Sequence, residues 1–236
     1  MNRINRNMQA REGGFTLIEI AIVLVIIGLL LGGVLQGQQL IENSRVKNAT
    51  NTFNGIAAAA FSYQDRYGRM PGDDGNTAAL DTRGGNWDTA VNTSIAGGNT
   101  NGILNATAAN AFTGVNTGTP AEEGALFFQH LRAAGFITGD PDIALGTAAI
   151  LPTNPFGGLV GVVGATLWTS LTGIKICMSN VPGSAAIALD QQLDDGTADS
   201  GRFRGQDDTT GADAPTDMAA ATAYAEDTNY VVCYRI

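Results

Sequence analysis

The sequence predicts an α+β protein: a long N-terminal helix crosses a membrane and then packs on a small antiparallel sheet with long loops. Three observations predict this fold. An apolar run of 21 residues starts at Phe15, and apolar residues then recur at helical spacing as far as Tyr67. The last third of the chain contains three segments rich in β-branched and aromatic residues.

The apolar run covers residues 15–35 and contains one charged residue, Glu19. A helix of this length covers roughly 30 Å at about 1.5 Å per residue, which matches the hydrocarbon core of a bilayer. The preceding segment, residues 1–14, carries three arginines. Because positive charge tends to stay in the cytoplasm, we expect a single-pass membrane protein with a cytoplasmic N-terminus and an exported remainder.

The polar sequence after Leu35 still carries one apolar stripe at alternating spacings of three and four. The stripe consists of Val46, Ala49, Phe53, Ile56, Ala60, Tyr63 and Tyr67. Gly68 and Pro71 then end the pattern. The sequence therefore predicts a helix over residues 15–68, about 80 Å long, whose outer half packs on an exported domain of residues 69–236.

The exported domain begins with a segment that is unsuited to much regular structure. Residues 72–120 are dense in Gly, Asn, Thr, Asp and Ala, so we expect a long surface loop region with at most one short helix, variable and facing partners. His130, the single histidine, is expected to be a packed or capping residue of a following helix. The expected helices are 122–134 and 184–193, and the expected strands are 158–168, 174–181 and 229–236.

Composition and motifs restrict the function further. A hydrophobic share of 44% with 15% charged residues excludes both a disordered chain and a multi-pass membrane protein. The 22 acidic residues against 13 basic ones give a net charge of −9, so we expect no nucleic-acid binding by the exported domain. No nucleotide-binding, zinc-protease or hydrolase motif is found in the sequence, and we expect neither enzyme activity nor a cofactor.

The start of the apolar run carries a specific motif. The sequence Gly14-Phe15-Thr16-Leu17-Ile18-Glu19, followed by an unbroken apolar helix, closely resembles the class III signal of type IV pilins and type II secretion pseudopilins. An ordinary secretory signal would place its cleavage site after the apolar run, where this sequence matches poorly. The resemblance implies that residues 1–14 are a leader peptide, that a prepilin peptidase cuts between Gly14 and Phe15, and that the new amine of Phe15 is methylated.

Glu19 needs a partner or a shallow position, because a charge at the centre of a membrane helix costs roughly 2.5–3.5 kcal/mol. After cleavage the nearest cation would be the Phe15 amine of its own chain or of a neighbour. The resemblance implies that Glu19 registers each incoming subunit against the previous one during assembly. The alternative is a glutamate that is merely tolerated at the membrane interface.

The resemblance also implies a function and partners. We expect a structural subunit that polymerises through its N-terminal helix, with identical or related pilin subunits, into an extracellular type IV pilus. Its other partners would be an inner-membrane assembly platform and, before assembly, the lipid of the bacterial inner membrane in which the chain would be anchored. The alternatives are a type II secretion pseudopilin or minor pilin in a short periplasmic or tip fibre, and a membrane-anchored binding domain that never polymerises.

Cys177 and Cys233 both lie in the exported part, which would be an oxidising compartment. Because pilins commonly close a C-terminal loop with one disulfide, the resemblance implies a bond that closes residues 177–233 around the acidic stretch 194–217. Two free buried thiols are the alternative.

A group of aspartates, Asp194, Asp195 and Asp199, follows the end of the expected helix 184–193. A helix C-terminus already presents partial negative charge, so a neutralising group is expected there. Arg202 or Arg204 could supply it, and so could Ca²⁺, which binds six to eight oxygen ligands. The spacing does not match an EF-hand, and solvated surface acids are the favoured interpretation.

Overall fold

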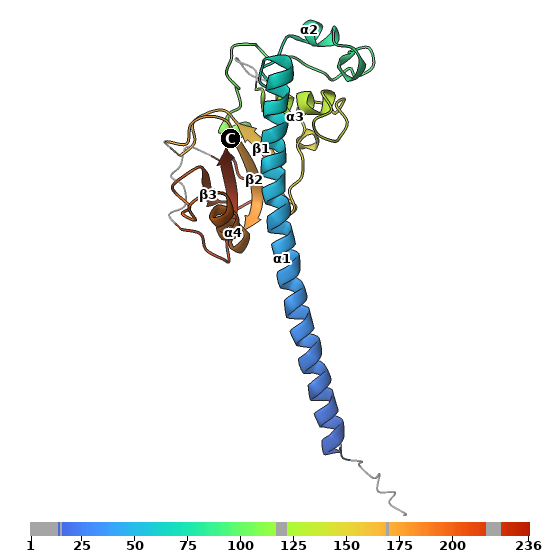
Figure 1. Cartoon of the computed structure of the whole chain (residues 1–236), viewed down its shortest axis with the longest axis vertical. Helices are drawn as coiled ribbons and strands as arrows, with labels where there is room; N and C mark the ends of the chain where they lie inside the picture. Colours follow the sequence, from blue (N-terminus) through green and yellow to red (C-terminus); the bar gives the residue numbers. More distant parts are fainter. Residues whose placement is uncertain (1–13, 15, 117–121, 169, 216–222) are drawn as a thin grey trace, which may run out of the picture. The chain divides into compact units, whose positions relative to one another are not determined.

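The computed structural model describes residues 14, 16–116, 122–168, 170–215 and 223–236 (Figure 1). The chain divides into two compact units, Met1–Asn43 and Ser44–Ile236. The division falls inside the long helix α1, Leu17–Tyr67. In the second unit, α1 packs on a four-stranded antiparallel sheet, which confirms the predicted α+β fold.

Helix α1 has the length and composition that the sequence predicts. It contains 51 residues, and an 18-residue window of it has a mean hydropathy of 2.8 and no buried residue, so it is long and apolar enough to cross a membrane. The helix ends where expected, because Gly68 adopts a left-handed φ of 71° and donates its N–H to the carbonyl of Gln64 at 2.8 Å.

The sheet has the strand order β1-β2-β4-β3 with antiparallel neighbours. Its strands are β1 Val160–Val163, β2 Lys175–Pro182, β3 Phe203–Asp207 and β4 Asn229–Arg235. Strands β1 and β4 lie inside segments that the sequence predicts, and β2 extends one residue beyond its predicted segment. The prediction missed β3, which lies in the stretch that was expected to be an acidic loop.

One face of the sheet packs on α1. Phe203 of β3 pairs with Tyr234 of β4, so both rings lie on the same face, and both contact Phe53 of α1 with ring centroids 5.9 and 5.8 Å apart. Helix α4, Gly183–Leu193, contacts α1. The Thr50 hydroxyl of α1 donates a hydrogen bond to the Gln192 side chain of α4 at 3.2 Å. The apolar stripe predicted for the outer half of α1 therefore forms the centre of the core.

The loop region after α1 contains short helices only, within its described residues 72–116: α2 Thr77–Asp81 and two 3₁₀ turns. Buried carboxylates fix its backbone. Asp73 accepts hydrogen bonds from the N–H groups of Asn101 and Gly102 at 2.9 and 2.8 Å. Glu123 accepts from Asn99 and Asn105, both at 2.9 Å. Acidic side chains thus satisfy backbone N–H groups of these loops, while apolar side chains of the same region, among them Leu80 and Trp87, belong to the hydrophobic core.

Helix α3, Gly124–Ala133, holds this loop region through His130, which is fully buried. The His130 Nδ1 atom accepts the N–H of Gly72 at 3.0 Å, and its Nε2 atom lies 2.8 Å from the carbonyl of Ala96. The ring is therefore neutral, with its proton on Nε2. Burial lowers the pKa of His130 to about 4, against a hydrogen bond to Ala96 that raises it.

We expect the second unit, Ser44–Ile236, to lose stability as the pH falls from about 6.5 towards 4. The unfolded chain takes up a proton on His130 over this range and the folded chain does not, which costs about 3 kcal/mol of unfolding free energy. Urea unfolding of the full chain in detergent at several pH values measures the effect. The variant His130→Gln should show a flatter dependence, and identical slopes for the two proteins would contradict the assignment.

Candidate functional site

The start of α1 is fixed by a reciprocal pair of side chains. The Thr16 N–H and hydroxyl both donate to one carboxylate oxygen of Glu19 at 2.8 Å, and the Glu19 N–H lies 3.3 Å from the Thr16 hydroxyl oxygen. Thr16 precedes the first helical residue, Leu17, so this is the capping box of the form Thr-x-x-Glu. It satisfies two backbone groups that a helix N-terminus otherwise leaves unpaired.

The capping box gives Glu19 a partner that the sequence analysis missed. We expected its partner to be the Phe15 amine, and Phe15 lies outside the described residues. The structure shows a partner within the same turn of the chain, Thr16. The spacing of a threonine and a glutamate three residues apart, just before an apolar run, is a signal that could have revealed it.

Gly14 precedes the capping box and is exposed. A Cβ atom built on Gly14 would meet no atom within 4 Å, and the residue does not have the left-handed φ that favours glycine. The fold of this chain therefore does not require glycine at position 14. Any requirement for a minimal side chain there comes from a partner that binds the segment.

Cys177 and Cys233 are joined by a disulfide. The two residues lie directly opposite each other in the β2–β4 register, with Cα atoms 4.0 Å apart, and both are fully buried. The alternative of two free thiols is therefore wrong. The bond closes a loop with a sequence separation of 56, which contains α4 and β3.

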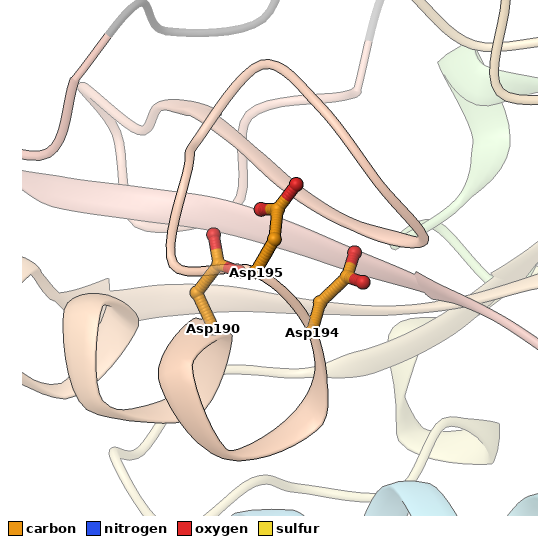
Figure 2. A group of neighbouring side chains, drawn as sticks. All are labelled: Asp190, Asp194 and Asp195. Carbon is orange, nitrogen blue, oxygen red and sulfur yellow. The ribbon is translucent and has the colours of Figure 1, made fainter.

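Three aspartates gather at the C-terminal end of α4: Asp190, Asp194 and Asp195 (Figure 2). One carboxylate oxygen from each lies within 4.8 Å of the others. Two of them belong to the predicted group, but Asp199 is not part of the cluster and is exposed. The third member, Asp190, is buried and was missed; it lies in the last turn of α4, and Asp194 directly follows the helix.

Neither arginine that was expected to neutralise this cluster does so. The Arg202 guanidinium donates to the carbonyl of Arg235 at 2.9 Å, and Arg204 donates to the Ser170 hydroxyl at 2.9 Å. Over the described ranges, the one ion pair joins Arg83 to Asp74, at 2.8 Å. The expectation of an arginine partner for the aspartates was therefore wrong.

Backbone N–H groups partly compensate the negative charge of the aspartates. Asp194 accepts hydrogen bonds from the N–H groups of Arg202 and Phe203, and so covers the start of the free edge of β3. Asp190 accepts the Gly196 N–H at 2.9 Å through one oxygen. Burial raises the pKa of Asp190 to about 6, and the neighbouring carboxylates act in the same direction.

Comparison with known proteins gives a match for the N-terminal segment. Residues 9–35 match the family model described as the prokaryotic N-terminal methylation motif, and the match includes Gly14, Phe15 and Glu19. The chain is also 35% identical over 97 residues to fimbrial protein EcpC of Eikenella corrodens. Together these matches support the type IV pilin family. These matches point to a structural subunit, and the N-terminal motif and the apolar helix point to membrane anchoring.

The second match is partial. It covers 41% of this chain and 62% of the fimbrial protein, so the chain spans less than two thirds of that relative's length. The family-model match at residues 9–35 confirms the resemblance of the N-terminal segment to a class III signal.

Proposed function

We propose that this chain is the structural subunit of a type IV pilus. A prepilin peptidase cleaves it between Gly14 and Phe15 and methylates the new amine, and the mature subunit polymerises through its N-terminal helix into an extracellular fibre. The observation that carries the proposal is the methylation motif at residues 9–35, which runs directly into the apolar start of α1. The likeness to a fimbrial protein supports a pilus rather than a periplasmic pseudopilus.

The first half of α1 has the surface that this function needs. Every large apolar side chain from Leu17 to Leu35 is exposed. A stretch with this surface requires lipid before assembly and neighbouring helices afterwards. Glycines in the same half leave open space where a Cβ would be, which permits close approach of other helices: Gly28, Gly32, Gly33 and Gly37.

Shearing intact cells tests the proposal. If the chain forms a pilus, mass spectrometry should find it as a major component of the sheared surface filaments. A chain confined to the cell envelope would instead favour the pseudopilin or minor pilin, and a chain that is never found in any fibre would favour a monomeric anchored domain. A strain that lacks the gene provides the control for contaminating proteins.

Three variants at the capping box separate the two roles of Glu19. Glu19→Val removes both cap and charge, Glu19→Gln keeps a capping side chain without charge, and Thr16→Ala keeps the charge with a weaker cap. We expect both Glu19 variants to be inserted and cleaved but to yield about tenfold fewer filaments, because roughly 1.4 kcal/mol of pairing with the Phe15 amine is lost.

Thr16→Ala should assemble near the wild-type level, since loss of an N-cap costs only about 1 kcal/mol of helix stability. The measurement is the ratio of sheared filament protein to processed protein in membranes. A normal ratio for Glu19→Gln would show that the glutamate acts through the cap and not through its charge.

A further inference from the structure

The disulfide lies on the far face of the sheet, which is the face that points away from α1. Cys177 of β2 lies opposite Cys233 of β4, and Arg204 of β3 also lies opposite Cys233, so these three side chains share one face. Phe203 and Tyr234, which contact α1, lie on the other face, because successive side chains of a strand alternate. Both cysteines are nevertheless fully buried, so something other than α1 covers the disulfide.

The loop between β1 and β2 crosses the far face. The Trp168 ring donates its Nε1–H to the Gln206 side chain of β3 at 3.0 Å, and the Ser170 hydroxyl accepts a hydrogen bond from Arg204 at 2.9 Å. Strand β4 lies between β2 and β3 in the sheet, so the loop must pass over β4 to reach these two side chains. Because Arg204 lies in the same cross-strand row as the disulfide, the loop passes over the row that contains the bond.

Lys175, the first residue of β2, fastens this loop. It lies two residues before Cys177 on the same face and is fully buried. Its ammonium donates hydrogen bonds to three carbonyls of the loop, at 3.2 Å to Leu171, at 2.6 Å to Gly173, and to Ala165. Over the described ranges, no carboxylate forms an ion pair with it. The buried charge of Lys175 is therefore compensated by the loop itself, which ties the position of the loop to the ammonium.

The backbone of the loop is strained where it crosses the sheet. Trp168 has a φ of 46°, in the left-handed region that a bulky residue rarely adopts. Its ring is 2% exposed, and Leu167 and Leu171 of the same loop are fully buried. Burial and the polar contacts of the loop thus favour its closed position, and the strain opposes it. Loss of one polar contact should shift the loop towards opening.

We propose that the loop between β1 and β2 shields the Cys177–Cys233 disulfide from reductants, and that the Lys175 ammonium fastens this shield. With the loop closed, a thiol or a phosphine does not reach the sulfur atoms. When the ammonium no longer holds the loop, the loop lifts from the far face, and the bond becomes reducible while the rest of the domain stays folded. This inference concerns the disulfide alone and does not rest on the proposed pilus function.

The charge of Lys175 makes the shield dependent on pH. Burial lowers the pKa of Lys175 to about 8, and the charge of Arg235, directly opposite in β4, acts in the same direction. The residue opposite Lys175 in β1 is Val163, which is uncharged, and the cation that β3 presents is Arg204, which binds the loop. As the pH rises through the pKa, the ammonium loses its charge and one of three donors. The shield should therefore weaken above about pH 8.

The test is the rate at which tris(2-carboxyethyl)phosphine reduces the native full chain in detergent. The phosphine attacks one sulfur and breaks the S–S bond. Water then converts it to the phosphine oxide, and the two cysteines take up two electrons and two protons as thiols. Iodoacetamide traps these thiols, and mass spectrometry counts them.

Lys175→Met keeps an unbranched side chain without the ammonium, and it should be reduced about tenfold faster than the wild type at pH 7. Lys47→Met makes the same change at an exposed lysine outside the loop and should match the wild type. The ratio of the Lys175→Met rate to the wild-type rate should fall towards one between pH 7 and pH 9, because the wild type then loses the ammonium itself. Comparison at equal pH cancels the pH dependence of the phosphine.

Urea separates opening of the loop from global unfolding. Opening of one loop exposes little surface, so low urea concentrations should hardly change the rate, whereas reduction through global unfolding accelerates steeply with urea. Three results would each overturn the proposal: equal rates for the wild type and Lys175→Met, a ratio that stays constant between pH 7 and pH 9, or a steep urea dependence for Lys175→Met.

If Lys175→Met does not fold, Ser170→Ala carries the test. Ser170 is exposed, so its replacement leaves the core intact and removes only the contact with Arg204. Reduction of Ser170→Ala should be severalfold faster than that of the wild type, and an unchanged rate would contradict the shield.

Discussion

Replacing Gly14 with tryptophan is expected to leave full-length precursor in the membrane and no filaments. Nothing lies within 4 Å of the position that a Cβ would take, so the variant should fold and insert as the wild type does. The peptidase, however, must accept an extended backbone immediately before the capping box at Thr16, and a bulky side chain there blocks it. The expected effect is therefore all or none.

Gly14→Ala is the matched control, since its single methyl group tests whether size or mere substitution matters. We expect partial processing for alanine and none for tryptophan. The mass of the membrane-extracted chain reports the result directly, because cleavage removes residues 1–14. Normal cleavage of the tryptophan variant would show that the peptidase does not read this position.

Removing the disulfide is expected to lower the unfolding free energy of the unit Ser44–Ile236 by about 4 kcal/mol. The bond closes a loop with a sequence separation of 56, and in the chain-entropy model a loop of that length restricts the unfolded state by this amount. Such a loss is a large fraction of the stability of an ordinary domain. The double variant Cys177→Ala/Cys233→Ala, compared with the wild type by urea unfolding in detergent, measures it.

Unfolding of the wild type in the presence of a reductant is the control for packing changes caused by the two alanine substitutions. Reduced wild type and the double variant should unfold at similar urea concentrations, and reductant should leave the double variant unchanged. A difference below about 1 kcal/mol between oxidised wild type and the double variant would contradict the prediction.

The long elements could be predicted because their signals are contiguous in the sequence. Helix α1 follows from an apolar run and a stripe of helical period that ends at Gly68. Strand β3 could not be found in the same way, because Arg204 and Gln206 alternate with Phe203 and Gly205 in a short polar segment. It is a strand because β4 offers it a pairing edge and Asp194 covers its start, and both are tertiary effects.

The candidate sites differ in the same way: one is contiguous in the sequence, and the other depends on the fold. The processing motif occupies six consecutive residues and was recognised from the sequence. The capping box between Thr16 and Glu19 was missed, although its spacing alone could have revealed it. The aspartate cluster depends on the fold, because the chain turns after Asp195 and leaves Asp199 outside while Asp190 joins from the helix. The partner of Arg202, the carbonyl of Arg235 in β4, likewise follows from the pairing of β3 with β4.

The most direct test of this account is the N-terminus of the chain in sheared filaments, determined by sequencing and mass spectrometry. The account predicts a subunit that begins at Phe15 with a methylated amine. Filament protein that begins at Met1, or at any residue other than Phe15, would contradict it.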